Sequence, residues 1–307
     1  MLIRHSSPSP RFRPEPDIQA AVETISEAFL RQVVETISLP RHFFAEPGQN
    51  RWTADWIAGQ LASFGYDVFV QGQFRNVVTR PVSSRSEPLV LIGAHYDSVP
   101  NCPGADDNAS AVAAMLACAQ ALARFAPTLP LCCVAFNAEE DGLVGSRDFV
   151  EAFLPESGWQ FRQVHILEML GYCSNVPGSQ RLPAGLPIQI PDTGNFLGII
   201  SNHRSNEVLE GLLNQTSAYV RALPVVGLKL YLGLEKVLPV LGRSDHAPFW
   251  NAGIPALMWT DTAEFRNPNY HLRSDTPDTL DYGFLRKSTQ LLFAHCLGYA
   301  SSYSSLS

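Results

Sequence analysis

The chain is poor in features that mark several classes of protein. Charged residues make up only 17% of its 307 residues, and the formal net charge is −7. A mildly acidic surface argues against nucleic acid or an anionic membrane as the main partner. No run of about 18 apolar residues occurs, so we expect no transmembrane helix. The composition therefore predicts neither a nucleic-acid partner nor a membrane partner.

Cysteine is scarce and shows no metal-binding or disulfide pattern. The six cysteines form no C-x-x-C pair, and Cys132-Cys133 lies inside an apolar run. Reduced, buried thiols are therefore favoured over a disulfide framework, which predicts a cytoplasmic protein. Residues 1–16 lack the apolar core of a signal peptide, and their Pro and Arg content indicates a flexible arm. A signal removed before this sequence begins would instead indicate a secreted or periplasmic protein.

Apolar sequence is abundant, because 46% of the residues are hydrophobic, enough for a large core. Apolar residues at helical spacing predict helices over 17–38, 53–64, 108–125, 145–153 and 280–303. Short apolar runs predict strands over 67–71, 76–80, 89–93, 131–137, 164–169, 196–201 and 256–261. Short strands that alternate with helices are typical of a sheet covered on both faces. The prediction is therefore an α/β fold, a three-layer α/β/α sandwich with a mixed, mainly parallel central sheet.

Acids and histidines lie at or after the ends of several predicted strands. These residues are His95, Asp97, Asp106, Asp107, Glu139, Glu140, Glu168 and His271, and Tyr270 directly precedes the last of them. Ligands of open α/β sheets bind beyond the carboxyl ends of the strands. Glu168 stands within the apolar run I-L-E-M-L, where an ionised acid is costly unless it is paired or bound to metal.

Each of these residues has an ordinary structural explanation when it is considered alone. A Glu pair after a strand is commonly a solvated turn, and D-D-N can form the N-cap and first turn of a helix. The joint occurrence of acids and histidines at several strand ends favours a metal site instead.

The ordered motifs H-x-D, D-D-N, E-E-x-G, E-M-x-G and Y-H-x-x-x-D-T resemble those of the M28 family of zinc aminopeptidases. They run from Gly93 to Leu280, and the flanking sequences G-L-V-G-S-R and R-S-D-H-A-P-F fit the same family. The resemblance implies a zinc-exopeptidase-like fold in which distant ligands meet in one site. We therefore expect a single peptidase domain over residues 17–307, although length alone would predict about two domains.

The resemblance implies a site for two zinc ions that share a hydroxide. It assigns Asp106 as the bridge between the ions and leaves Asp107 either to the start of the following helix or to a position behind the ligands. The remaining implied ligands are His95 and Glu168 for one zinc, and Glu140 and His271 for the other. Imidazole nitrogens and carboxylate oxygens are ligands that suit zinc.

The resemblance also implies roles for residues around the metals. Glu139 would be the general base that takes a proton from water and delivers it to the leaving amine. Asp97 would hold the second imidazole nitrogen of His95, and Tyr270 would donate a hydrogen bond to the developing oxyanion. Glu168 departs from the family pattern, in which this ligand is often Asp.

The implied activity is that of an aminopeptidase acting on peptide substrates. Three alternatives remain: a single-zinc glutaminyl-peptide cyclotransferase, a carboxypeptidase of the same superfamily, and a non-catalytic binding protein on a peptidase-like scaffold. D-D-N after His95 favours two ions, because the cyclase motif has a single Asp at this place. Asp245-His246 and the segments 177–195 and 227–236 are candidates for lining the substrate pocket.

Overall fold

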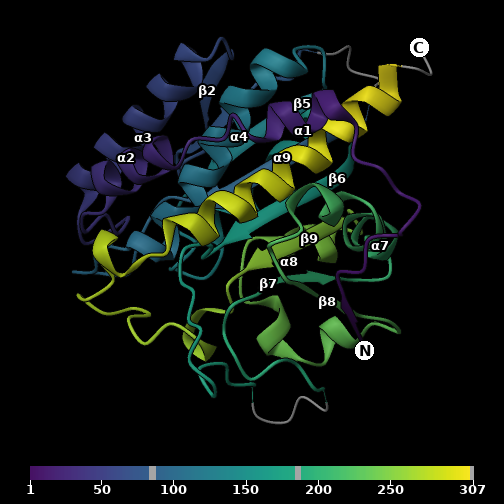
Figure 1. The fold of residues 1–307 in the computed structure, drawn as a ribbon. Coiled ribbons are helices and arrows are strands. Elements are labelled where there is room, and N and C mark those ends of the chain that lie inside the picture. The colour runs from purple at the N-terminus through teal and green to yellow at the C-terminus, as the bar shows by residue number, and fades with distance from the viewer. Residues whose placement is uncertain (83–87, 184–187, 305–307) are drawn as a thin grey trace.

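The structure is a computed structural model, and it describes residues 1–82, 88–183 and 188–304 (Figure 1). These residues contain a nine-stranded sheet in the order β1-β8-β7-β9-β6-β4-β5-β3-β2. The strands are β1 (Leu2–His5), β2 (Val68–Gln71), β3 (Asn76–Thr79), β4 (Leu89–His95), β5 (Leu131–Phe136), β6 (Phe161–Glu168), β7 (Leu197–Ser201), β8 (Val225–Lys229) and β9 (Ala256–Thr260). Strands β9, β6, β4 and β5 pair in parallel, whereas β3 and β7 join this centre in antiparallel fashion. The sheet is therefore mixed with a parallel centre, as predicted.

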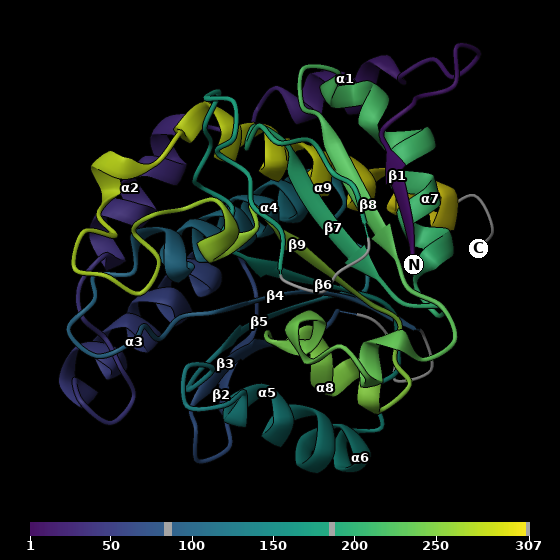
Figure 2. The ribbon, with the colours of Figure 1, turned by 90° about the horizontal axis from the view of Figure 1, so that it is seen from below.

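Helices cover both faces of the sheet, which confirms the predicted three layers (Figure 2). One face carries α1 (Pro16–Val22), α2 (Glu27–Ile37), α3 (Pro47–Ser63), α4 (Ala111–Phe125), α7 (Asn206–Asn214) and α9 (Tyr282–Ser304). The other carries α5 (Val144–Asp148), α6 (Leu154–Ser157) and α8 (His246–Asn251). Single turns are η1 (Ala105–Ser110), η2 (Phe149–Phe153), η3 (Thr216–Val220), η4 (Leu234–Lys236), η5 (Pro239–Gly242), η6 (Ala263–Phe265) and η7 (Pro277–Thr279). Within the described ranges, no helix combines the length and apolarity needed to cross a bilayer.

The register of the central strands brings their carboxyl ends to one edge of the sheet. His95, the last residue of β4, lies opposite Phe136, the last residue of β5. Glu168 at the end of β6 lies opposite Thr260 at the end of β9. Because parallel strands end on the same side, the residues that follow each of them lie close together. The fold thus places its acids and histidines in one region.

The N-terminal residues differ from the prediction of a flexible arm over residues 1–16. Leu2–His5 forms β1, an edge strand that pairs antiparallel with β8, with Ile3 opposite Leu228. The sequence L-I-R-H is too short to show the alternation that predicts a strand, and backbone pairing to β8 supplies the missing stabilisation.

The predicted helix over 17–38 is in fact two helices, α1 and α2. Ser26 has extended backbone and its Oγ accepts a hydrogen bond from the backbone N–H of Phe29 at 3.2 Å, so it caps a new helix. The helical apolar spacing continues across the break, because residues of both helices enter the same core.

Candidate metal centre

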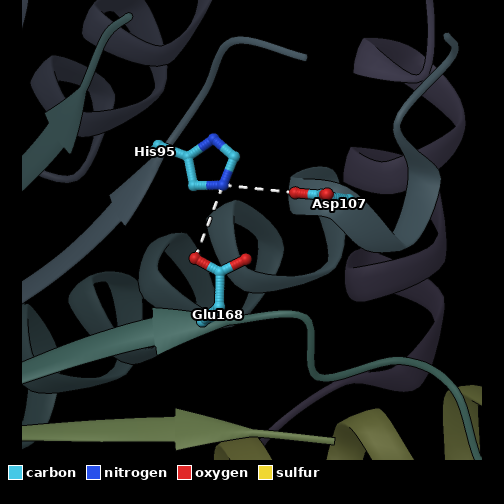
Figure 3. A group of neighbouring side chains, drawn as sticks. All are labelled: His95, Asp107 and Glu168. Carbon is cyan, nitrogen blue, oxygen red and sulfur yellow. Dashed lines mark ion pairs between the residues drawn. The ribbon is translucent and has the colours of Figure 1, made fainter. Parts of the chain in front are cut away.

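His95 lies between three carboxylates where β4 ends. Its side chain is 1% exposed, and its Nε2 lies 3.2 Å from Asp107 Oδ1 and 3.5 Å from Glu168 Oε2 (Figure 3). Its Nδ1 lies 3.4 Å from Asp97 Oδ1. One imidazole is thus surrounded by acids from the β4 end, the η1 turn and the β6 end.

His271 meets the same aspartate from the opposite side. Its Nε2 lies 3.1 Å from Asp107 Oδ2 and 3.3 Å from Glu140 Oε2. Two groups of potential metal ligands therefore share Asp107, one with His95 and Glu168, the other with Glu140 and His271. Within each group the ligand atoms lie within 4.8 Å of one another.

Asp106 lies outside both groups, which corrects the expectation that it bridges two metals. Its Oδ1 accepts the backbone N–H of Gly171 at 2.8 Å, and its Oδ2 accepts the side-chain amide of Asn267 at 2.6 Å. Successive side chains of the η1 turn point in different directions, so only one acid of the pair faces the histidines. That acid is Asp107, whose peptide bond to Asn108 is cis.

Asp275 holds the turn that carries both acids. Its carboxylate accepts the backbone N–H of Asp106 at 2.9 Å and that of Asp107 at 3.1 Å. Asp275 is the aspartate of the motif Y-H-x-x-x-D-T. The spacing of the motif does not show which backbone groups this aspartate binds. The sequence likewise carries no signal for Asn267 as a partner of Asp106.

Arg41 holds the loop between His95 and Asp107 in place. Its buried guanidinium donates to the carbonyl oxygens of Tyr96 and Pro103 at 2.5 Å and of Gly104 at 2.9 Å. The sequence analysis did not predict this role for Arg41. Nothing in the sequence distinguishes a buried arginine between two helices from an exposed one.

Asp97 connects the ends of β4 and β5. Its two carboxylate oxygens accept the backbone N–H groups of Glu139 and Glu140, each at 3.2 Å. The same carboxylate lies beside His95. Asp97 therefore contacts both the histidine at the end of β4 and the two glutamates that follow β5. This clamp on the two glutamates was not predicted.

The buried acids and histidines shift one another's pKa values. Burial raises the pKa of Glu139 well above its usual range, against the opposing charge of His95. Burial likewise raises the pKa of Glu140 to about 7. Burial lowers the pKa of His271, but contacts with Asp107 and Glu140 outweigh it and raise that pKa to about 10. Metal binding at such a cluster should depend on pH, because the ligands must lose their protons before they can bind a cation.

Uncommon backbone conformations flank the site. Ala138 (φ 53°), Met169 (φ 49°) and His271 (φ 59°) all occupy the left-handed region, which few residues other than glycine adopt. The first precedes Glu139 and the second follows Glu168. Such conformations gather at functional sites, where the surrounding structure enforces them.

Two further residues support the site's edge. Ser244 Oγ donates a hydrogen bond of 2.6 Å to Glu168 Oε2, which anchors this longer carboxylate. The Tyr270 ring stacks on the His271 ring, with centroids 3.7 Å apart. His246 is buried and its Nε2 contacts the Leu241 carbonyl at 2.8 Å, outside both ligand groups.

A cavity of about 150 Å³ adjoins the site. Ile200 on β7, Leu228 on β8 and Met258 on β9 form its sheet wall, and Glu168 and Tyr270 lie at its border with the metal centre. The expected pocket segment 177–195 contributes Gln180–Pro183, Ile188 and Ile190, with 184–187 outside the described residues. The segment 227–236 contributes only Leu228, because its first residues belong to β8, and Asp245-His246 does not line the cavity.

The donor set fits zinc. Both ring nitrogens of His95, Asp107 Oδ1 and Glu140 Oε1 are buried and have no hydrogen-bond partner among the described residues. Buried polar atoms without partners are costly unless a ligand satisfies them. Imidazole nitrogens together with carboxylate oxygens are the ligands of catalytic zinc sites.

Comparison with known proteins identifies the family of this chain. The profile of peptidase family M28 matches residues 76–295. The uncharacterised protein YfbL of Escherichia coli is 32% identical over 276 residues, which cover 83% of this chain and 82% of that protein.

Two solved structures are similar in fold. The zinc aminopeptidase BSAP of Bacillus subtilis is 26% identical with a TM-score of 0.53, over 72% of this chain and 49% of its own. The LapA aminopeptidase of Legionella pneumophila has a TM-score of 0.74 at 21% identity, over 94% of this chain and 76% of its own. This chain thus spans about half the length of BSAP. With the family profile covering most of the chain and the motif residues gathered in one site, the protein belongs to peptidase family M28.

Proposed function

We propose that this protein is an aminopeptidase that binds two zinc ions and removes the N-terminal residue of peptides. The observation that carries the proposal is the position of Asp107, whose two oxygens face different histidines. A single-zinc site would leave one of the two ligand groups without a metal. The shared acid therefore supports two ions side by side.

His95 and Glu168 would hold one zinc, Glu140 and His271 the other, and Asp107 both. Zinc, when bound, supplies a Lewis acid for the peptide carbonyl and lowers the pKa of water. The protein itself holds the proposed ligands in place. In this structure Asp97 binds the backbone after β5, Asp275 binds the η1 turn, and Ser244 binds the carboxylate at the end of β6.

Glu139 is the proposed general base. It is 8% exposed, lies within reach of both His95 and Glu140, and is held through its backbone by Asp97. Its carboxylate would take a proton from the attacking water and deliver it to the nitrogen of the leaving peptide. Tyr270 would donate a hydrogen bond to the oxygen that becomes negative in the transition state.

The cavity supports a preference for large apolar N-terminal residues. Leu228, Ile200 and Met258 are direct cross-strand neighbours, so they form one row on the same sheet face. That row borders the metal centre at Glu168 and Tyr270. The substrate's free amine would lie among the carboxylates, while its apolar side chain would enter the cavity.

The proposal is tested with leucine p-nitroanilide, N-acetyl-leucine p-nitroanilide and an N-terminal glutaminyl peptide, each with zinc-loaded protein. We expect release of nitroaniline from the free-amine substrate only. Cyclisation of the glutaminyl peptide without nitroaniline release would indicate a cyclotransferase. Absence of any turnover with zinc bound would overturn the enzymatic proposal.

A further inference from the structure

Arg243 lines the cavity from the loop that precedes α8. Its Nη2 donates a hydrogen bond to Tyr270 Oη at 3.1 Å, and its Nη1 pairs with Glu264 Oε1. Arg181 in turn donates to the backbone carbonyl of Glu264 at 2.6 Å. These contacts form a short chain of polar groups that ends at the Tyr270 phenol.

We propose that Arg243 is the positioning residue that orients Tyr270 toward the reacting carbonyl, an inference that rests on the proposed aminopeptidase activity. A phenol oxygen has one O–H to donate and can accept hydrogen bonds as well. The Arg243 N–H occupies an acceptor position, and within the described hydrogen bonds Tyr270 Oη donates to nothing. The phenol proton therefore remains free for a substrate oxygen.

The cation also strengthens the donor it orients. A hydrogen bond donated by a charged group into an oxygen polarises the O–H on that same oxygen, so the phenol donates more strongly. A donor held in place before the reaction needs no reorganisation when charge develops on the carbonyl oxygen. The stacked His271 ring fixes the orientation of the tyrosine ring, and Arg243 fixes the oxygen.

The geometry of a guanidinium is needed for this arrangement. Arg243 binds Glu264 and Tyr270 through different nitrogens, which a planar fork can do at once. A lysine ammonium in its place could satisfy one partner well, but not both in the same geometry. The Arg243 side chain is 45% exposed, so its replacement leaves no buried charge and the variants should fold.

The test is a double-mutant cycle with Arg243→Met, Tyr270→Phe and the combined variant on leucine p-nitroanilide. We expect Arg243→Met to lower kcat about 10-fold or more, since a single oriented oxyanion donor is worth about 100-fold or more. KM should change less than about threefold. The combined variant should be no slower than Tyr270→Phe alone, because residues that act as a unit are not additive. Arg243→Lys should recover only part of the loss.

Two measurements separate positioning from general damage. Zinc affinity by calorimetry should be unchanged in Arg243→Met, because Arg243 touches no proposed ligand. Arg147→Met is the matched control, since Arg147 is exposed and its side chain bonds only the Gly142 carbonyl among the described contacts. The kcat of this variant should stay at the wild-type value.

Three results would overturn the proposal while leaving the aminopeptidase function intact. These are an unchanged kcat in Arg243→Met, losses in the two single variants that multiply in the combined one, and a loss that appears wholly in KM. An inactive wild-type protein would overturn the proposed function and this inference together.

Discussion

At the residue scale, the site depends on which of two adjacent acids faces the histidines. Asp107 lies between His95 and His271, whereas Asp106 ties Gly171 and Asn267 together. The sequence analysis expected the neighbouring acids and histidines to gather in one region, and they lie close together because each stands at or after the end of a different buried strand. It could not separate Asp106 from Asp107, since their difference lies in the backbone conformation of one turn.

The two aspartates make a matched pair of variants. Asp107→Asn should lower zinc affinity by at least about 10-fold, because it removes the charge of the carboxylate that both ligand groups share. Asp106→Asn keeps an oxygen for Gly171 and should leave zinc affinity within about threefold of wild type. Isothermal titration with zinc measures both, and the reverse order of effects would reinstate Asp106 as the ligand.

The general-base role belongs to a single carboxylate. Glu139→Gln keeps the shape and the backbone contact to Asp97 but cannot accept a proton. We expect kcat to fall at least about a hundredfold, the usual scale for loss of a general base, while bound zinc is retained. Steady-state kinetics with metal analysis checks this, and undiminished turnover would rule out Glu139 as the base.

At the element scale, the strand ends gather the ligands and three neighbouring strands build the cavity. Strands β4, β5, β6, β7 and β9 were predictable because they are short, apolar and bounded by polar sequence. Strands β1 and β8 were not, because L-I-R-H carries little pattern and the G-L-K of β8 continues into the apolar segment 227–236 that follows it. The cavity could not be predicted, since its wall depends on the register of β7, β8 and β9.

Filling the cavity should change side-chain preference. Ile200→Phe adds volume to the centre of the row formed with Leu228 and Met258. We expect the ratio of kcat/KM for leucine over alanine p-nitroanilide to fall about 10-fold or more, within the range that pocket methylenes contribute. Val176→Phe, at a residue 65% exposed and outside the cavity lining, is the control. An unchanged ratio in Ile200→Phe would place the substrate side chain elsewhere.

A buried histidine on β6 should make stability sensitive to acid. His165 is fully buried, its Nδ1 accepts the Trp259 indole N–H at 3.2 Å, and its Nε2 has no partner among described residues. Burial lowers the pKa of His165 well below its usual value. An unfolded histidine takes up a proton near pH 6.5, so the unfolded state binds more protons as pH falls and unfolding becomes easier.

His165→Asn tests this sensitivity, because its amide oxygen can still accept the Trp259 N–H. Between pH 7 and pH 5, the free energy of unfolding should fall less in the variant than in wild type, by roughly 2 kcal/mol. Urea denaturation in the presence of a chelator, at both pH values, measures the difference. Identical pH dependence in the two proteins would show that His165 is not the group responsible.

At the scale of the whole molecule, metal binding should couple to folding. The ligands come from positions 95 to 271, so zinc would link segments on both sides of the sheet's centre. Zinc at 100 times its Kd should stabilise the folded state by about 2.7 kcal/mol for each independent site. Thermal unfolding with zinc and with chelator checks this, and equal Tm values would argue against a preformed metal centre.

The central claim is a two-zinc site organised around Asp107. Native mass spectrometry of the zinc-loaded chain tests it most directly, because it counts the ions on each intact molecule. The account predicts that the dominant species of the wild-type protein carries two zinc ions, and that the dominant species of Asp107→Asn carries fewer. A wild-type protein that saturates with one ion, or an Asp107→Asn variant that retains two, would contradict it.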